Sequence, residues 1–75
     1  MIELLEAEQH VALSNRMVER QRELIDMLQC EGNGTVSEQI IFDSLMITLA
    51  LHVTNRQRVL AKLSFQTIEG AMQAA

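Results

Sequence analysis

Residues 40–53 constrain the fold of this chain more than any other stretch. Their sequence, IIFDSLMITLALHV, is apolar at ten of fourteen positions. On a helix these side chains do not form one stripe, because Ile41, Phe42 and Ile47 point in three different directions. A helix that is apolar most of the way round has to be buried on several sides. One partner helix within 75 residues cannot cover all of it, so the sequence predicts assembly with another chain.

Length and cysteine content indicate one small domain, residues 1–75, in the cytoplasm. Domains of this size are marginally stable alone and compensate with disulfides, metals or oligomerisation. The single cysteine, Cys30, excludes a disulfide framework and favours a reducing compartment. The first residues lack the pattern of a signal peptide, and the longest apolar run, residues 45–53, is too short to cross a bilayer. We therefore expect a soluble protein without a membrane partner.

Composition favours long helices and argues against nucleic acid as a partner. The chain has no proline, and its glycines lie only at positions 32, 34 and 70. Its net charge of −4 opposes general binding to a phosphate backbone. The only aromatic side chains of the Phe, Trp and Tyr type, Phe42 and Phe65, are too few for a base-stacking platform.

A first helix is predicted over residues 2–30 from a seven-residue repeat. One position of the repeat is always aliphatic and the other is small or polar until the last turn, and a sustained period of 3.5 residues is typical of coiled coils and helical bundles. The eight inner positions predicted by this repeat are Leu4, Ala7, Val11, Ser14, Val18, Gln21, Ile25 and Leu28.

A short turn separates this helix from a second one, predicted over residues 36–66. Gly32 is suited to the left-handed conformation that ends a helix, and Thr35 with Glu38 forms a capping-box pattern that begins the next. The tail, residues 66–75, is expected to fray. The apolar stripe predicted for the second helix is Phe42, Met46, Leu49, Val53, Arg56, Leu60 and Leu63, with a second row at Leu45, His52 and Val59.

The expected fold is an all-α antiparallel helical hairpin that dimerises into a four-helix bundle. A connection of about four residues makes the two helices antiparallel neighbours, so that residue i faces roughly residue 66 − i. A hairpin has one seam and no enclosed core, and the two-fold dimer is the commonest closed assembly. The predicted dimer interface is Met17, Leu24, Ile41, Phe42, Leu45, Met46, Leu49 and Val59.

The same register places His10, Ser14, His52 and Arg56 in one polar layer within the seam. The favoured interpretation is structural, because buried polar residues can fix register and orientation. A metal site is the first alternative, and it would need the histidines of two copies, packed with their loops at the same end. A phosphate-accepting histidine at His10 is the second. We predict no catalytic residue, cofactor or metal, since Ser14 near His52 lacks a third group and oxyanion donors.

Arg16, Arg20 and Arg22 form a small basic patch on the first helix, interleaved with acidic residues. Such a pattern is typical of a solvated helix face. An alternative is an RNA-binding face on a hairpin dimer, by analogy of architecture with the plasmid RNA-binding bundle Rop.

Several short motifs resemble those of a known group of proteins. They are His10-Val11-Ala12, residues 20–25 (RQRELI), Gly32 with Thr35, and residues 51–58 (LHVTNRQR). In this order they resemble short hypothetical proteins, common in rhizobia and related alphaproteobacteria, that are themselves predicted helical hairpins. The resemblance implies two helices around a glycine-containing turn, with a histidine near the start of one and another late in the second. It implies no activity, cofactor or partner.

The function predicted from these features is non-enzymatic. We expect a homodimeric bundle that acts as a regulatory or adaptor protein by binding another protein. The alternatives are the RNA-binding hairpin dimer and, last, a metal or phosphotransfer site at His10 and His52.

Overall fold

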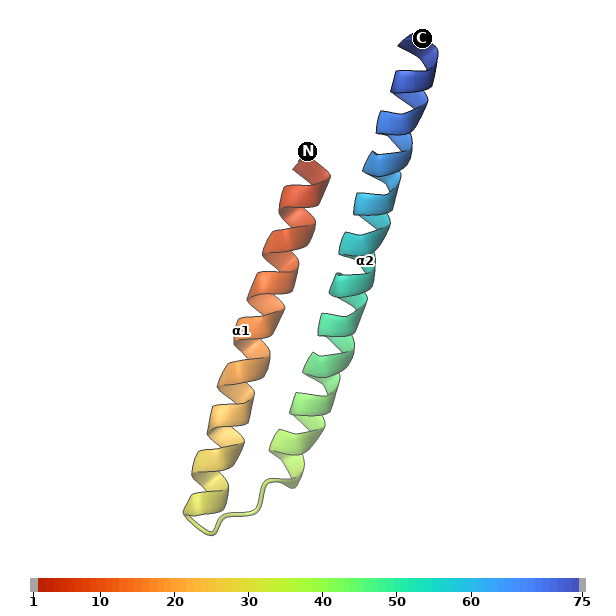
Figure 1. Cartoon of the computed structure of the whole chain (residues 1–75). Helices are drawn as coiled ribbons and strands as arrows, with labels where there is room; N and C mark the ends of the chain where they lie inside the picture. The colour runs from red at the N-terminus through yellow and green to blue at the C-terminus, as the bar shows by residue number, and fades with distance from the viewer. Residues whose placement is uncertain (1, 75) are drawn as a thin grey trace.

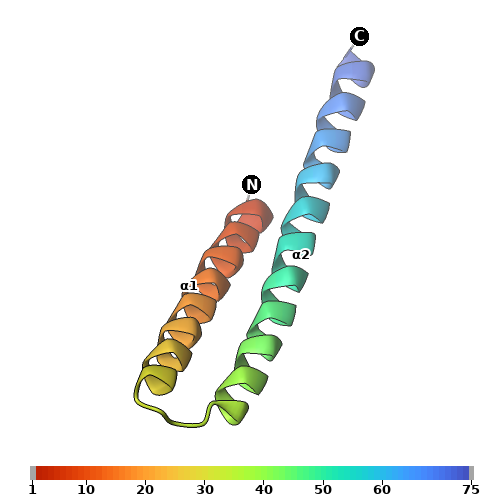
Figure 2. The ribbon, with the colours of Figure 1, turned by 60° about the horizontal axis from the view of Figure 1, so that its bottom comes forward.

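The structure is a computed structural model that describes residues 2–74 as two helices joined by a short turn. Helix α1 covers Ile2–Cys30 and helix α2 covers Val36–Ala74. The helices run antiparallel and lie side by side in both views (Figures 1 and 2). Together they form a rod measuring 67 × 15 × 13 Å. The predicted all-α antiparallel hairpin is confirmed.

The inner face of α1 is the one that the seven-residue repeat predicts. Ala7, Val11, Ser14, Val18 and Ile25 are buried. Leu4, Gln21 and Leu28, the other three positions of the repeat, are half-buried. We call the contact between these residues and α2 the seam. Its α1 side is confirmed in full, because alternating aliphatic and small residues leave only one face on which a partner helix can lie close.

The turn ends α1 with a Schellman motif. Gly32 has a φ of 79°, in the left-handed region that favours glycine. The Gly32 amide donates to the Gln29 carbonyl at 3.0 Å, and the Asn33 amide donates to the Leu28 carbonyl at 2.9 Å. These two bonds satisfy carbonyls that the helix end would otherwise leave without a partner. The predicted role of Gly32 is confirmed.

The start of α2 differs from the predicted capping box. The Thr35 carbonyl accepts the first helical hydrogen bond, from the Gln39 amide at 2.8 Å. Among the hydrogen bonds of residues 2–74, none joins the Thr35 hydroxyl to the Glu38 amide. The Glu38 carbonyl instead accepts a hydrogen bond from Nε2 of Gln21 at 3.0 Å, so this turn of α2 is tied directly to α1.

The inner face of α2 differs from the predicted stripe at two positions. Met46 and Leu60 are exposed, at 40% and 42%, so their assignment to the seam is wrong. The inner positions are Glu38, Phe42, Leu45, Leu49, His52, Arg56, Val59 and Leu63, all half-buried except Val59, which is buried; Val53 of the predicted stripe is half-buried beside them. Their alternating steps of four and three residues match the period of α1, so the two helices share one coiled-coil seam.

Helix α2 continues beyond Gln66, where we predicted its end, as far as Ala74. The hydroxyl of Thr67 donates to the Leu63 carbonyl at 2.9 Å within this extension. Gly70 does not stop the helix, because a single glycine costs only about 1 kcal/mol and the residues around it are good helix formers. The extension projects past the N-terminal end of α1 (Figure 1). Residues 67–74 therefore form an overhang.

Candidate interaction surface and polar layer

Two contacts fix the level at which α1 faces α2. The Lys62 ammonium lies 3.6 Å from a Glu3 carboxylate oxygen, and the Arg22 guanidinium lies 5.6 Å from the centre of the Phe42 ring. The numbers of facing residues thus add up to about 65, close to the predicted 66. Residues seven apart lie on the same side of a helix, because two turns take about 7.2 residues. The sum of about 65 gives the level of each exposed residue along the hairpin, and the seven-residue step gives the side on which it lies.

One long side of the hairpin, which we call the histidine flank, carries four levels. From the open end towards the turn they pair Glu3 with Lys62, His10 with Asn55, Met17 with Thr48, and Leu24 with Ile41. His10 and Asn55 also line a common pocket, which confirms that these two residues share a side. The flank is charged or polar near the open end and apolar near the turn.

The apolar half of this flank is exposed. Met17, Leu24 and Ile41 keep 46%, 37% and 50% of their surface in contact with solvent. Leu13 and Met27, one turn from Met17 and Leu24 respectively, are also exposed and widen the same patch on α1. Sequence reasoning missed these two residues, although their spacing of four and three from the flank was visible.

The predicted dimer interface divides between two places. Four of its residues, Phe42, Leu45, Leu49 and Val59, are inner positions of the seam within the hairpin. The other four, Met17, Leu24, Ile41 and Met46, are exposed. Met46 lies on the opposite flank, seven residues from Gln39, which lines a pocket with Arg22 and Gln29. The structure therefore brings together Met17, Leu24 and Ile41 and separates them from Met46.

The polar layer is assembled around two histidines. The ring centres of His10 and His52 lie 5.2 Å apart, with the rings tilted by 46°. His10 is exposed at the edge of the seam and His52 is half-buried within it. Ser14, one turn from His10, is buried. The predicted register brought these residues to one level, and the structure adds that the two imidazoles are direct neighbours.

Arg56 is the fourth residue of the polar layer, and one of its nitrogen atoms lacks a hydrogen-bond partner. Its side chain is half-buried at an inner position one turn from His52. Its Nε atom is buried and makes no hydrogen bond. A buried N–H group without a partner destabilises the fold that contains it. Among residues 2–74, Arg56 is thus the one residue with a buried side-chain nitrogen or oxygen that lacks a hydrogen-bond partner.

Metal-ligating groups are sparse in the described part of the chain. Within residues 2–74, no group of three or more His, Cys, Asp or Glu side chains is placed to hold a metal ion. His10 and His52 are one pair of such side chains that comes from different helices, with ring centres 5.2 Å apart. Cys30, at the end of α1, is exposed and remote from this pair along the helix.

The three arginines predicted as an RNA face do not share one side of α1. Arg22 lies over the Phe42 ring and 3.5 Å from a Glu19 carboxylate oxygen, so it is directed towards the seam. Arg16 and Arg20 come six and two residues before Arg22, so neither lies on the same side of α1 as Arg22. Both are exposed. Glu19 partly neutralises the cluster. The RNA-binding interpretation stays a prediction.

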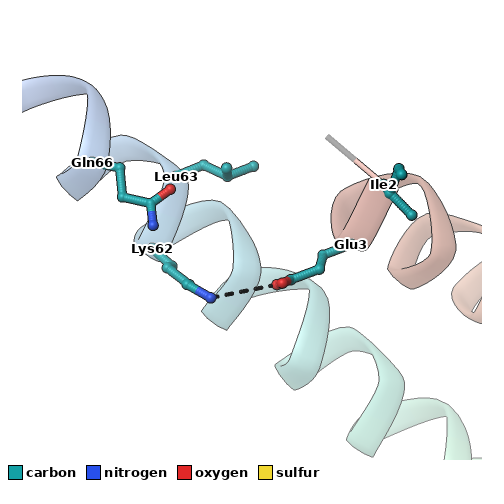
Figure 3. Close-up of a pocket in the computed structure, with 5 residues that line it drawn as sticks. All are labelled: Ile2, Glu3, Lys62, Leu63 and Gln66. Carbon is teal, nitrogen blue, oxygen red and sulfur yellow. Dashed lines mark ion pairs between the residues drawn. The ribbon is translucent and has the colours of Figure 1, made fainter. Parts of the chain in front are cut away.

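A pocket lies at the open end of the hairpin. It is lined by Ile2, Glu3, Lys62, Leu63 and Gln66, and the Glu3–Lys62 ion pair runs across it (Figure 3). The two charges compensate each other, so the pocket offers no net charge to a ligand. Its residues close the end of the seam.

The side of α2 turned away from α1 carries a second apolar row, which we call the outer row. Its members are Ile40, Ile47, Leu51, Phe65, Ile68 and Met72, all exposed. By length and composition alone, α2 contains within Val36–Gln73 a segment able to cross a membrane. We expected no such segment because the uninterrupted apolar run is short. The difference arises because the intervening Ser, Thr and Asn residues carry no charge.

Comparisons with models of protein families, with curated proteins and with solved structures find no match to this chain. The resemblance to short helical-hairpin proteins of rhizobia therefore stays a prediction. Function has to be inferred from the exposed apolar surface and the polar layer.

Proposed function

We propose that two copies of this chain associate through the apolar half of the histidine flank, and that the resulting four-helix bundle acts in the cytoplasm as an adaptor for another protein. The exposure of Met17, Leu24 and Ile41 on one side of both helices carries this proposal. Three large apolar side chains at adjacent levels lose contact with water when a second hairpin lies against them. Each contributes roughly 1–2 kcal/mol when it becomes buried.

The Thr48 and Ser44 hydroxyls beside this patch can be buried without leaving an unpaired donor. The Thr48 hydroxyl, at the level of Met17, already donates to the Ser44 carbonyl at 3.1 Å. The Ser44 hydroxyl in turn donates to the Ile40 carbonyl at 3.1 Å. Because these donors are satisfied within α2, a partner covering them leaves no unpaired donor behind. The surface near the turn is therefore suited to a protein interface.

A soluble bundle accounts for the apolar character of α2 better than a membrane span. Helix α1 lies along α2 for its whole length, so inserting α2 into lipid would carry α1 with it (Figure 2). Charged side chains within the hydrocarbon region are costly and rare. The charged residues of α1 number nine: Glu3, Glu6, Glu8, Arg16, Glu19, Arg20, Arg22, Glu23 and Asp26.

The outer row of α2 remains exposed when the flank is covered. Ile40 and Ile47 lie on the side of α2 away from α1, and Ile68 continues the row into the overhang. An apolar row at helical spacing is the surface on which an amphipathic helix of another protein docks. The adaptor role assigns the flank to the second copy and the outer row to that partner.

Substitution of Leu24 tests the proposal against a matched control. Leu24 and Met46 are similarly exposed, at 37% and 40%, but lie on opposite flanks. We expect the wild-type chain to be a dimer in sedimentation equilibrium. Leu24→Glu should raise its dissociation constant at least about tenfold, because a charge would be buried in an apolar contact. Met46→Glu should leave the dissociation constant unchanged, with helicity retained in both variants.

Three results would contradict the proposal. A wild-type chain that stays monomeric at micromolar concentration removes the dimer. A dimer weakened only by Met46→Glu moves the interface to the opposite flank. Sedimentation of the native protein with the membrane fraction after cell lysis, resistant to salt and carbonate, assigns α2 to a bilayer instead.

A further inference from the structure

The contact between His10 and His52 joins two metal-ligand side chains from different helices. His10 comes from α1 and His52 from α2, and their ring centres are 5.2 Å apart. The antiparallel register fixes this proximity, because both residues lie at the same level of the seam. Imidazole is the commonest metal ligand in proteins and binds Zn²⁺, Cu²⁺ and Ni²⁺ in its neutral form.

We propose that His10 and His52 of one chain clamp a divalent transition-metal ion such as Zn²⁺ between α1 and α2. Two imidazoles that each bind a tetrahedral ion through one nitrogen, at about 2.0–2.1 Å, have ring centres about 5 Å apart. The observed separation of 5.2 Å therefore meets the requirement for sharing one ion. Binding requires one nitrogen of each ring to point towards the ion.

The electrostatic surroundings of the pair have two opposing parts. Glu3 and Glu6 line the same pocket of about 190 Å³ as His10, and their carboxylates favour a cation there. Arg56, one turn from His52, opposes it. Glu3 is partly neutralised by Lys62, so Glu6 is the main source of attraction. Glu6→Gln should weaken binding a few-fold, whereas Arg56→Met should strengthen it.

The clamp supplies two protein ligands, and water completes the coordination. Within residues 2–74 no third His, Cys, Asp or Glu joins the pair in a ligand cluster. Such a site keeps open positions, unlike the four-ligand sites that hold structural zinc. A bound ion also links the two helices, and an ion that binds only the folded hairpin stabilises it by mass action. The site is thus a means of reinforcing the weakest level of the seam.

Titration with Zn²⁺ alone, near neutral pH, tests the clamp. Cys30→Ser is the reference protein, because the exposed thiol is a competing ligand. The chain has only two histidines, so their ring Hε1 signals are readily assigned in proton NMR spectra. We expect both signals to shift together, saturating at one ion per chain. Calorimetry should show at least about tenfold weaker binding for His10→Gln and for His52→Gln, since each removes one arm of a two-point attachment.

A shifted histidine provides the matched control. In the reference protein, Gln9→His with His10→Gln keeps two histidines but moves one to the outer side of α1, where it cannot approach His52. This variant should lose the tight binding, and Zn²⁺ should no longer raise its thermal unfolding midpoint. Circular dichroism confirms that the helices are retained. Equal Zn²⁺ affinity in this variant, or Hε1 signals unmoved by excess Zn²⁺, would overturn the site and leave the rings as a stacked pair only.

Discussion

Arg56 shows how a single residue weakens an otherwise regular seam. Seven of the eight inner residues of α1 are aliphatic or small, but Arg56 places a cationic group at an inner position of α2. Its stem packs along the seam while the buried Nε atom has no hydrogen-bond partner. Leaving one buried donor unsatisfied costs about 1–3 kcal/mol. The hairpin therefore carries a local destabilisation at the level of the histidine pair.

Replacing Arg56 with an apolar residue of similar length should stabilise the hairpin. We expect Arg56→Met to raise the free energy of unfolding by about 1 kcal/mol, because methionine keeps the packing of the stem and removes the unsatisfied donor. Urea unfolding followed by circular dichroism measures this change. Arg58→Met is the control, since Arg58 is exposed and a surface substitution shifts stability by less than about 0.5 kcal/mol. A loss of stability in Arg56→Met would instead indicate that Arg56 has an acidic partner in another copy.

The turn between the helices depends on one glycine and not on the other. Gly32 has the left-handed φ of 79° on which the Schellman motif depends. Gly34 lies two residues on without a positive φ, and an added Cβ would meet nothing within 4 Å. Two chemically identical substitutions in one turn should thus have different effects.

Gly32→Ala should lower the free energy of unfolding by about 1–2 kcal/mol, because a Cβ is strained in the left-handed region. Gly34→Ala should leave it unchanged or raise it slightly, by restricting the unfolded chain. Thermal unfolding of the two variants side by side measures the difference. Equal effects at both positions would mean that α1 does not end in the left-handed conformation in solution.

Sequence patterns predicted α1 fully and α2 only in part, for a physical reason. In α1 the outward positions are mostly charged or polar, so the repeat has only one possible phase. In α2, Leu45 and Met46 are both apolar, and both lie one turn from Phe42 or Leu49. Periodicity alone cannot decide which of them faces the partner helix. The position of α1 decides it, and it turns Leu45 inward and Met46 outward.

The candidate sites were predictable to the extent that they follow from register. The antiparallel register alone brought His10 and His52 to one level, and the structure places their rings next to each other. The side of the hairpin on which Ile41 and Met46 are exposed was not predictable. It depends on whether Leu45 or Met46 faces α1, and the sequence left this open. Leu13 and Met27 lie on α1, four and three residues from Met17 and Leu24, so this spacing could have identified them from the sequence.

At the scale of the whole molecule, the histidine flank is asymmetric along its length. Its levels near the turn, Leu24 with Ile41, are apolar, while the level at the open end is the Glu3–Lys62 ion pair. Two copies packed with their turns at the same end match each level of the flank with the same level of the other copy, so that apolar residues meet apolar residues near the turn. Full overlap with turns at opposite ends would set Leu24 against the ion pair and leave both unsatisfied. The flank therefore favours a same-end dimer.

A spin label on the native Cys30 distinguishes the two packings, because this exposed single cysteine lies at the turn. In a same-end dimer both labels lie within the width of the bundle, about 25 Å given interaxial distances of 8–10 Å. With turns at opposite ends and full overlap, they lie about 40 Å or more apart, since α1 rises about 1.5 Å per residue. We expect the short distance in pulsed electron paramagnetic resonance. The long one would contradict same-end packing, and it would also separate the His10–His52 levels of the two copies, leaving each pair to act alone.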